Sequence, residues 1–185
     1  MSRTGPSRFA AVLLGATLML GGCSAADAAD TAADAPTTSD AAFPVTIEHA
    51  HGETTIESKP ERIVTLGWMT EDVVAALGVV PVGVPTNYAG EDGYSEWFSD
   101  YVTDELGAEL PEIIGIDGEG EFDLEQILSL DPDLILAPHS GITEVQYERM
   151  SEIAPTIPYA ETPWISDPWQ DFTSEIGLAL GESER

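Results

Sequence analysis

Aromatic and histidine side chains follow several apolar segments, and they are the residues best suited to bind a small molecule. Trp68 follows one such segment, His139 follows "DLILA", and Tyr88 and Tyr94 lie in a loop rich in turn-forming residues. An indole offers a flat apolar face and one N–H donor. A neutral imidazole can donate a hydrogen bond or ligate a metal ion. The candidate ligand-binding residues are Trp68, Asn87, Tyr88, Tyr94, His139, Ser140 and Trp164.

Most of these residues also have a structural alternative. Trp68 and Trp164 can pack against a neighbouring helix instead of facing a ligand. His139 and Ser140 can instead cap the helix that follows them. Trp97 begins a predicted helix, where both a ligand contact and core packing are open to it, and we expect core packing.

Two further patterns predict chemistry less well. His49 and His51 are two residues apart on a predicted strand and share one face, which permits metal binding, but a surface hairpin is the simpler context. The acidic segment 117–128 resembles a calcium loop only superficially, because Phe122 and Leu128 stand where that loop needs Gly and Glu. We therefore expect no metal site, and we interpret these acids as a solvated loop.

Strands and helices alternate along the chain behind a predicted β-hairpin. The hairpin pairs 45–48 with 54–57 around a turn at 51–53. Apolar segments that predict strands lie at 62–66, 79–84, 112–116, 133–137 and 156–160. Helices are predicted at 70–78 with Thr70 as N-cap, 96–106, 123–130 with Asp123 as N-cap, 141–154, and 168–185, the last running to the final residue.

This alternation predicts an α/β fold, a parallel sheet with helices on both faces. In open sheets of this kind, ligands bind beyond the carboxyl ends of the strands. The segments expected at that edge are 67–68, 85–95, 117–121, 138–143 and 161–164, and they contain all the candidate binding residues.

The amino terminus has the features of an export signal. Arg3 and Arg8 precede an uncharged run at 10–20, which is too short to span a membrane comfortably. The stretch Leu20–Cys23 resembles a bacterial lipobox, which implies cleavage before Cys23 and lipidation of that residue. The alternative is an incidental thiol. Residues 23–42 lack aromatic and large aliphatic side chains, and we interpret them as a flexible acidic tether.

The chain is strongly acidic, with a formal net charge of −28. This charge nearly excludes nucleic acid as a partner and favours a cationic one, although it can also reflect a salty habitat. After loss of residues 1–22, the basic residues are Lys59, Arg62, Arg149 and Arg185. None is predicted at the carboxyl edge of the sheet. A strongly anionic ligand would need an Arg clamp there, so we expect a neutral or cationic ligand.

Several segments resemble the iron-siderophore substrate-binding lipoproteins of bacterial ABC importers. They are "KPERIVTLGW", "ALGVVPVGV", "LEQILSLDPDLIL" and "HSGITEVQYERMSEIAPTIPYAE" followed by "PWQ". The resemblance implies two α/β lobes joined by a long helix, and a lipid anchor on the extracytoplasmic face of the cell membrane. It implies that an iron-siderophore complex is captured between the lobes and delivered to a membrane permease. With no Arg clamp predicted, we expect this complex to be neutral or cationic, such as a ferric hydroxamate. The resemblance also implies that Glu125, in the "LE" pair, docks on Arg of the permease. The alternative for Glu125 is an ordinary surface residue.

The resemblance divides the chain into a signal peptide at 1–22, a tether at 23–42, an amino-terminal lobe at 43–166 and the start of the linking helix at 167–185. The second lobe is expected to be absent, so the chain is also open to interpretation as a non-functional truncated fragment. The sequence is compatible as well with a binding protein for another metal-chelate, such as haem or cobalamin, and with an adhesion or decoy lipoprotein. No catalytic signature is present, so we expect a binding protein that uses no cofactor and is not an enzyme.

Overall fold

The computed structural model describes residues 43–86, 90, 92–165 and 168–182, all of which belong to one compact unit, Pro36–Arg185. The predicted signal peptide, the whole predicted tether with Cys23, and residues Asn87 and Tyr88 lie outside the described residues. In the part of the chain that is described, no helix is long and apolar enough to cross a membrane.

The predicted hairpin is present, but its turn is shifted. Strands β1 (Val45–His49) and β2 (Gly52–Ile56) pair antiparallel, and His49 lies opposite Gly52. The turn is therefore the two residues 50–51 and not 51–53 as expected. Gly52 explains this difference, because its φ of 126° is a conformation that side-chain-bearing residues rarely adopt.

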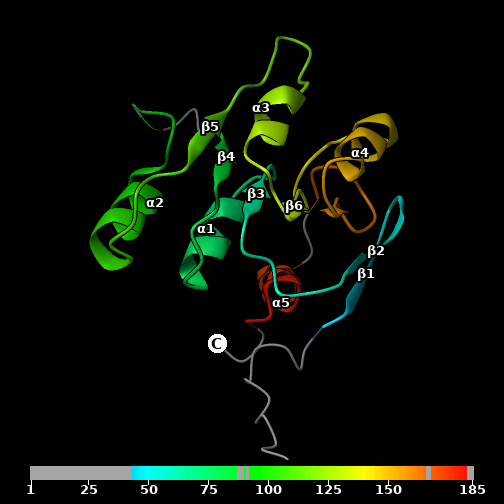
Figure 1. Ribbon diagram of the computed structural model, residues 1–185, viewed down its shortest axis with the longest axis horizontal. Helices are drawn as coiled ribbons and strands as arrows, with labels where there is room; N and C mark the ends of the chain where they lie inside the picture. Colours follow the sequence, from blue (N-terminus) through cyan, green and yellow to red (C-terminus); the bar gives the residue numbers. More distant parts are fainter. Residues whose placement is uncertain (1–42, 87–89, 91, 166–167, 183–185) are drawn as a thin grey trace, which may run out of the picture. The chain divides into compact units, whose positions relative to one another are not determined.

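Five short parallel strands form the central sheet, in the order β5-β4-β3-β6-β7 (Figure 1). All three residues of β3 and of β6, which lie side by side in the middle of the sheet, are buried, as expected for a strand covered on both faces. The strands are β3 (Ile63–Thr65), β4 (Gly83–Pro85), β5 (Glu112–Ile114), β6 (Leu134–Leu136) and β7 (Thr156–Ile157).

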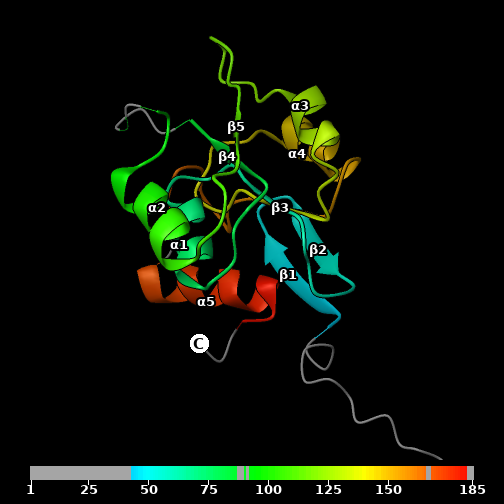
Figure 2. The same cartoon turned by 60° about the vertical axis from the view of Figure 1, so that its left-hand side comes forward.

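Helices cover both faces of this sheet, as predicted (Figure 2). On one face, Ile63 and Leu134 pack with residues of α1 (Thr70–Ala76), α5 (Trp169–Leu180) and the hairpin. The same face carries α2 (Glu96–Asp100) and the π-helical turn η1 (Tyr101–Glu105), through Val84 of β4. On the other face, Val64 and Ile135 pack with α3 (Leu124–Ser129) and α4 (Glu144–Ser151).

Helix α5 ends earlier than predicted. It stops at Leu180, because Gly181 adopts a left-handed conformation with φ 69°. The N–H of Glu182 then donates to the carbonyl of Gly177 at 2.7 Å, which satisfies a free carbonyl of the last turn. Lys59 forms an ion pair with Glu182 at 2.6 Å and ties this helix end to the segment before β3.

Three other local predictions have mixed outcomes. Asp123 caps α3 as predicted, since its side chain accepts from the N–H of Gln126. Thr70 does not cap α1, because it is the first helical residue and left-handed Met69 takes the N-cap position. Trp97 is 48% exposed and not in the core. The buried side of its helix is formed by Phe98, one residue later in the helical phase.

Glu71 is a buried carboxyl group in the first turn of α1. Only 6% of the residue is exposed, and its Oε2 atom has no hydrogen-bond partner in the described part of the chain. Burial raises the pKa of Glu71 from 4.5 to about 7, since ionisation in a low-dielectric site is unfavourable. The folded chain therefore holds this proton more tightly than the unfolded chain, so stability is lost as pH rises through 4.5–7.

We predict that Glu71→Gln stabilises the protein at pH 8 and has little effect at pH 4.5. The gain at pH 8 is at most about 3 kcal/mol, because one pKa unit corresponds to about 1.4 kcal/mol. Urea unfolding at several pH values measures it. His49 also has a shifted pKa, but it titrates in both proteins and cancels in the difference. The charge of Asp72 contributes to the raised pKa of Glu71, so its effect is part of the measured difference.

The control for this experiment is Glu96→Gln, an exposed first-turn residue of α2. It should leave the pH dependence of stability unchanged. An equal pH dependence in wild type and Glu71→Gln would show that Glu71 is not the titrating group.

Candidate ligand-binding site

The candidate site lies at the carboxyl edge of the sheet and centres on His139. We use the name His139 cluster for Trp68, His139, Trp164 and Phe172, whose contacts are given below. Trp68 and Trp164 expose 69% and 62% of their surface, respectively, which is unusual for tryptophan. Two flat apolar faces therefore stand at the edge where this fold binds ligands.

The backbone at the ends of β3 and β6 places Trp68 beside His139. The N–H of Leu66 donates to Leu136, and two residues later the N–H of Trp68 donates to the carbonyl of His139, both at 2.8 Å. The pairing of β3 with β6 thus continues past the last strand residues. The Trp68 and His139 rings meet edge to face, with centroids 6.1 Å apart.

Both backbone polar groups of Trp164, its N–H and its carbonyl, form hydrogen bonds. Its N–H donates to the carbonyl of Ser140 at 2.9 Å, and its carbonyl accepts from Nε2 of His139 at 3.1 Å. These bonds hold Trp164 in a left-handed conformation, φ 61°, which is strained for a residue with a bulky side chain. Its indole covers Gly141, where an added Cβ would lie only 2.1 Å from Nε1.

Ser140 is fully buried, and its hydroxyl donates to the carbonyl of Ala137 at 2.6 Å. The structure therefore gives Ser140 a role in shaping the turn after β6 and leaves its hydroxyl away from the surface, unlike the ligand-facing position expected from the sequence. The helix cap considered as the alternative role of His139 and Ser140 is supplied by Thr143, which forms a capping box with Gln146.

Tyr94 lies apart from the His139 cluster. Its hydroxyl donates to the carbonyl of Pro111, and its ring stacks on Phe98 with centroids 6.1 Å apart. Both its polar and its apolar parts are thus engaged within the protein. Asn87 and Tyr88 fall outside the described residues, so their placement in the site stays a prediction.

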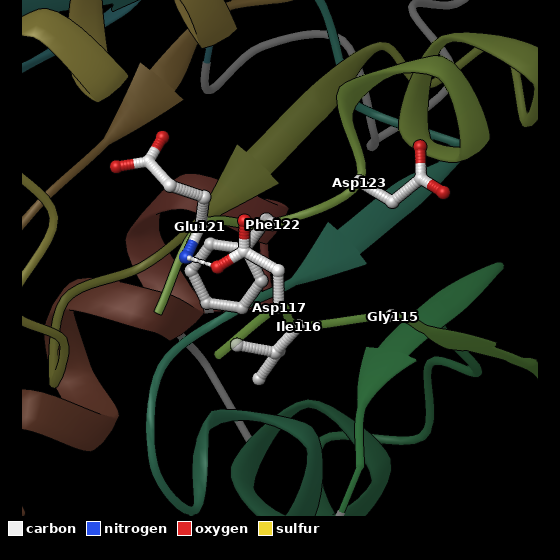
Figure 3. Close-up of a pocket in the computed structure, with 6 residues that line it drawn as sticks. All are labelled: Gly115, Ile116, Asp117, Glu121, Phe122 and Asp123. Carbon is white, nitrogen blue, oxygen red and sulfur yellow. Dashed lines mark hydrogen bonds between the residues drawn. The ribbon is translucent and has the colours of Figure 1, made fainter. Parts of the chain in front are cut away.

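A second feature of this edge is an open hollow of about 380 Å³ after β5, lined by Gly115, Ile116, Asp117, Glu121, Phe122 and Asp123 (Figure 3). The Asp117 carboxylate accepts from the N–H groups of Glu119 and Glu121 at 2.8 and 2.9 Å. These bonds lower the pKa of Asp117, because they favour its ionised form. Glu121 accepts from Gln146. The sequence led us to expect a solvated acidic loop. The structure shows instead that hydrogen bonds organise this loop.

Positive charge lies away from this edge among the described residues. Lys59 is paired with Glu182, and Arg62 donates to the carbonyls of Leu130 and Asp131, which lie between α3 and β6. Arg149 is on the last turn of α4. Within 43–86, 90, 92–165 and 168–182, no group of three or more His, Cys, Asp or Glu is arranged to hold a metal ion.

The fold is an α/β lobe, and its candidate ligand-binding residues lie at the carboxyl ends of parallel strands. The chain belongs to the periplasmic binding protein family, which matches residues 63–185. This is a family of solute-binding proteins and not of enzymes, in agreement with the prediction of a non-catalytic protein.

Similar proteins include a probable siderophore-binding lipoprotein, YfiY, of Bacillus subtilis, which is 29% identical over 76% of this chain and 39% of its own length. The Fe(3+) dicitrate-binding periplasmic protein FecB of Escherichia coli is 30% identical over 63% of this chain and 35% of its own. The solved structure of PiaA from Streptococcus pneumoniae with ferrichrome has 34% identity and a TM-score of 0.67 over 76% of this chain and 46% of that one. The chain thus spans a third to a half of the length of these relatives.

Sequence reasoning missed two residues of the site. Phe172 contacts the His139 ring edge to face, with centroids 6.3 Å apart, and Gly141 seats the Trp164 indole. The helical spacing of Phe172 indicates only the buried side of its helix. Gly141 carried one usable signal, since a glycine beside candidate binding residues often marks a close approach by another group.

We predict that Gly141→Ala displaces the Trp164 indole and leaves the fold intact. The new methyl group would occupy the position of the indole, and Trp164 is exposed enough to swing away. Tryptophan fluorescence should report the change as altered emission and increased acrylamide quenching, with a loss of unfolding free energy of about 1 kcal/mol or less.

Gly118→Ala is the matched control, because a Cβ at Gly118 meets nothing within 4 Å. Its emission and quenching should equal those of wild type. If Gly141→Ala also leaves both unchanged, the indole does not rest on Gly141 in solution.

Proposed function

We propose that this chain is a lobe of an ABC-importer binding protein that captures a ferric siderophore and delivers it to a membrane permease. The observation that carries the proposal is the pair of exposed indoles, Trp68 and Trp164, held by backbone hydrogen bonds at the carboxyl edge of the sheet. Ligand pockets typically have apolar and aromatic walls with a few fixed polar groups, and capture requires no covalent chemistry.

Names of related proteins support this class of ligand. They include a siderophore-binding lipoprotein, a ferric dicitrate-binding protein and a protein solved with ferrichrome. Within the class, we propose a neutral or cationic complex of the hydroxamate type. The reason is charge: among the described residues no lysine or arginine lies at the edge, and the chain as a whole is strongly acidic. The dicitrate-binding relative makes ferric citrate the second candidate ligand.

A titration with three ligands tests this proposal. We expect ferrichrome to quench tryptophan fluorescence and to bind more tightly than ferric dicitrate or a ferric tris-catecholate. Because Trp68 supplies one apolar face, Trp68→Ala should weaken ferrichrome binding about tenfold or more, in keeping with the loss of a large aromatic contact.

Trp97→Ala is the matched control, because this exposed tryptophan lies on α2 and stacks on Tyr101. It should leave the affinity unchanged. Preference for the catecholate would contradict the proposed ligand charge, and tight binding of haem or cobalamin alone would favour a different metal-chelate as the ligand.

The proposed anchor and docking residue complete this function. We propose that Cys23 is lipidated and holds the lobe at the extracytoplasmic face of the membrane, as the lipobox resemblance and the lipoprotein among the relatives support. We propose that Glu125 docks on a cationic permease surface. It is exposed in the first turn of α3.

Reversing the charge at Glu125 should impair delivery but not capture. We expect Glu125→Lys to reduce uptake of radioactive ferric siderophore by cells about tenfold, because a docking ion pair would become a repulsion. Ferrichrome affinity of the purified protein should stay within about twofold of wild type. Glu148→Lys, at an exposed position of α4, is the control, and equal uptake by both variants would rule out a docking role for Glu125.

A further inference from the structure

We propose that His139 is a positioning residue that fixes the distance between the two exposed indoles and does not itself contact the ligand. This inference rests on the proposed function, because it concerns what sets the width of the binding surface. It differs from the role expected from the sequence, in which the His139 side chain faces the ligand.

The hydrogen bond to Trp164 determines which nitrogen of His139 carries a proton. A carbonyl oxygen can only accept, so Nε2 must be protonated to bond Trp164 at 3.1 Å. Nε2 then has no lone pair for iron, and Nδ1 is the one ring nitrogen that keeps a lone pair. The His139 backbone carbonyl is engaged as well, since it accepts from the N–H of Trp68 at 2.8 Å.

The ring of His139 lies among three parts of the chain. It meets Trp68 edge to face at 6.1 Å and Phe172 edge to face at 6.3 Å, and it donates to Trp164. These partners come from the end of β3, the amino-terminal part of α5 and the segment between β7 and α5. One imidazole therefore connects the two exposed indoles with the adjoining helix.

Trp164 needs such a restraint because its left-handed backbone is unfavourable by about 1–2 kcal/mol for a residue with a Cβ. The N–H of Trp164 is held by Ser140, and its carbonyl is held by His139. Without the second bond, the carbonyl loses its partner and the peptide can rotate toward an ordinary conformation. The indole would then leave Gly141 and move relative to Trp68.

Fluorine NMR of the whole chain labelled with 5-fluorotryptophan tests this role in the absence of any ligand. The sequence has four tryptophans, each assigned by one Trp→Phe change. His139→Phe keeps a ring but has no donor, whereas His139→Gln keeps an N–H donor. We expect the Trp164 resonance to shift and broaden in His139→Phe and to stay near its wild-type position in His139→Gln.

The Trp97 resonance reports whether each variant is folded, because Trp97 stacks on Tyr101 away from the cluster. Glu148→Gln, at an exposed position of α4, is the surface control and should move no resonance. An unmoved Trp164 resonance in His139→Phe would overturn the proposal. So would equal displacement in His139→Phe and His139→Gln, because the hydrogen bond would then not be the restraint.

Ferrichrome titration of the same variants provides the second readout. We expect about tenfold weaker binding in His139→Phe and less than about threefold in His139→Gln. Equal loss in both variants, with Trp164 undisturbed, would identify His139 as a direct ligand contact and overturn its positioning role. If wild type does not bind ferrichrome, the proposed ligand fails, while the NMR comparison still decides whether His139 positions Trp164.

Discussion

The candidate site depends on the continued backbone pairing of β3 with β6 beyond their last strand residues. The N–H groups of Leu66 and Trp68 donate to the segment that runs from Leu136, at the end of β6, to His139. These bonds fix the separation of the two segments where they leave the sheet. Here the two segments stay joined for one more step after the strands end, so the indole of Trp68 and the imidazole of His139 are presented on backbone that is tied to the sheet. Rigid presentation lowers the entropy lost when a ligand is bound.

The burial pattern explains why much of the fold could be predicted. The fully buried runs in β3 and β6 need cover on both faces, and a parallel sheet with helices on each side provides it. The start of a helix could also be predicted where a hydrogen bond between near neighbours in the sequence fixes it, as in the N-cap at Asp123. Helix α5 was predicted too long, because the left-handed backbone at Gly181 is not evident from a glycine in a run that already contains Gly177.

The site was only partly predictable, and the reason is distance along the chain. The sequence placed Trp68, His139 and Trp164 at one edge, and the structure brings these three together. The sequence could not reveal that the His139 side chain forms a hydrogen bond with the backbone carbonyl of Trp164, 25 residues further along the chain. Trp97 was misassigned for a similar reason: helical phase alone does not say which side faces Val84, and Phe98 occupies that side.

The loop after β5 keeps its shape without a bound metal ion. Its carboxylate at Asp117 accepts from two amide N–H groups of the same loop, so this rim keeps its shape through near neighbours in the chain. A calcium-dependent loop of similar acidity loses its order when a calcium chelator removes the ion. The hydrogen bonds of Asp117 are made within the loop, so removing a metal ion does not break them. Because the pKa of Asp117 is lowered, its carboxylate stays ionised and keeps these bonds in more acidic solution.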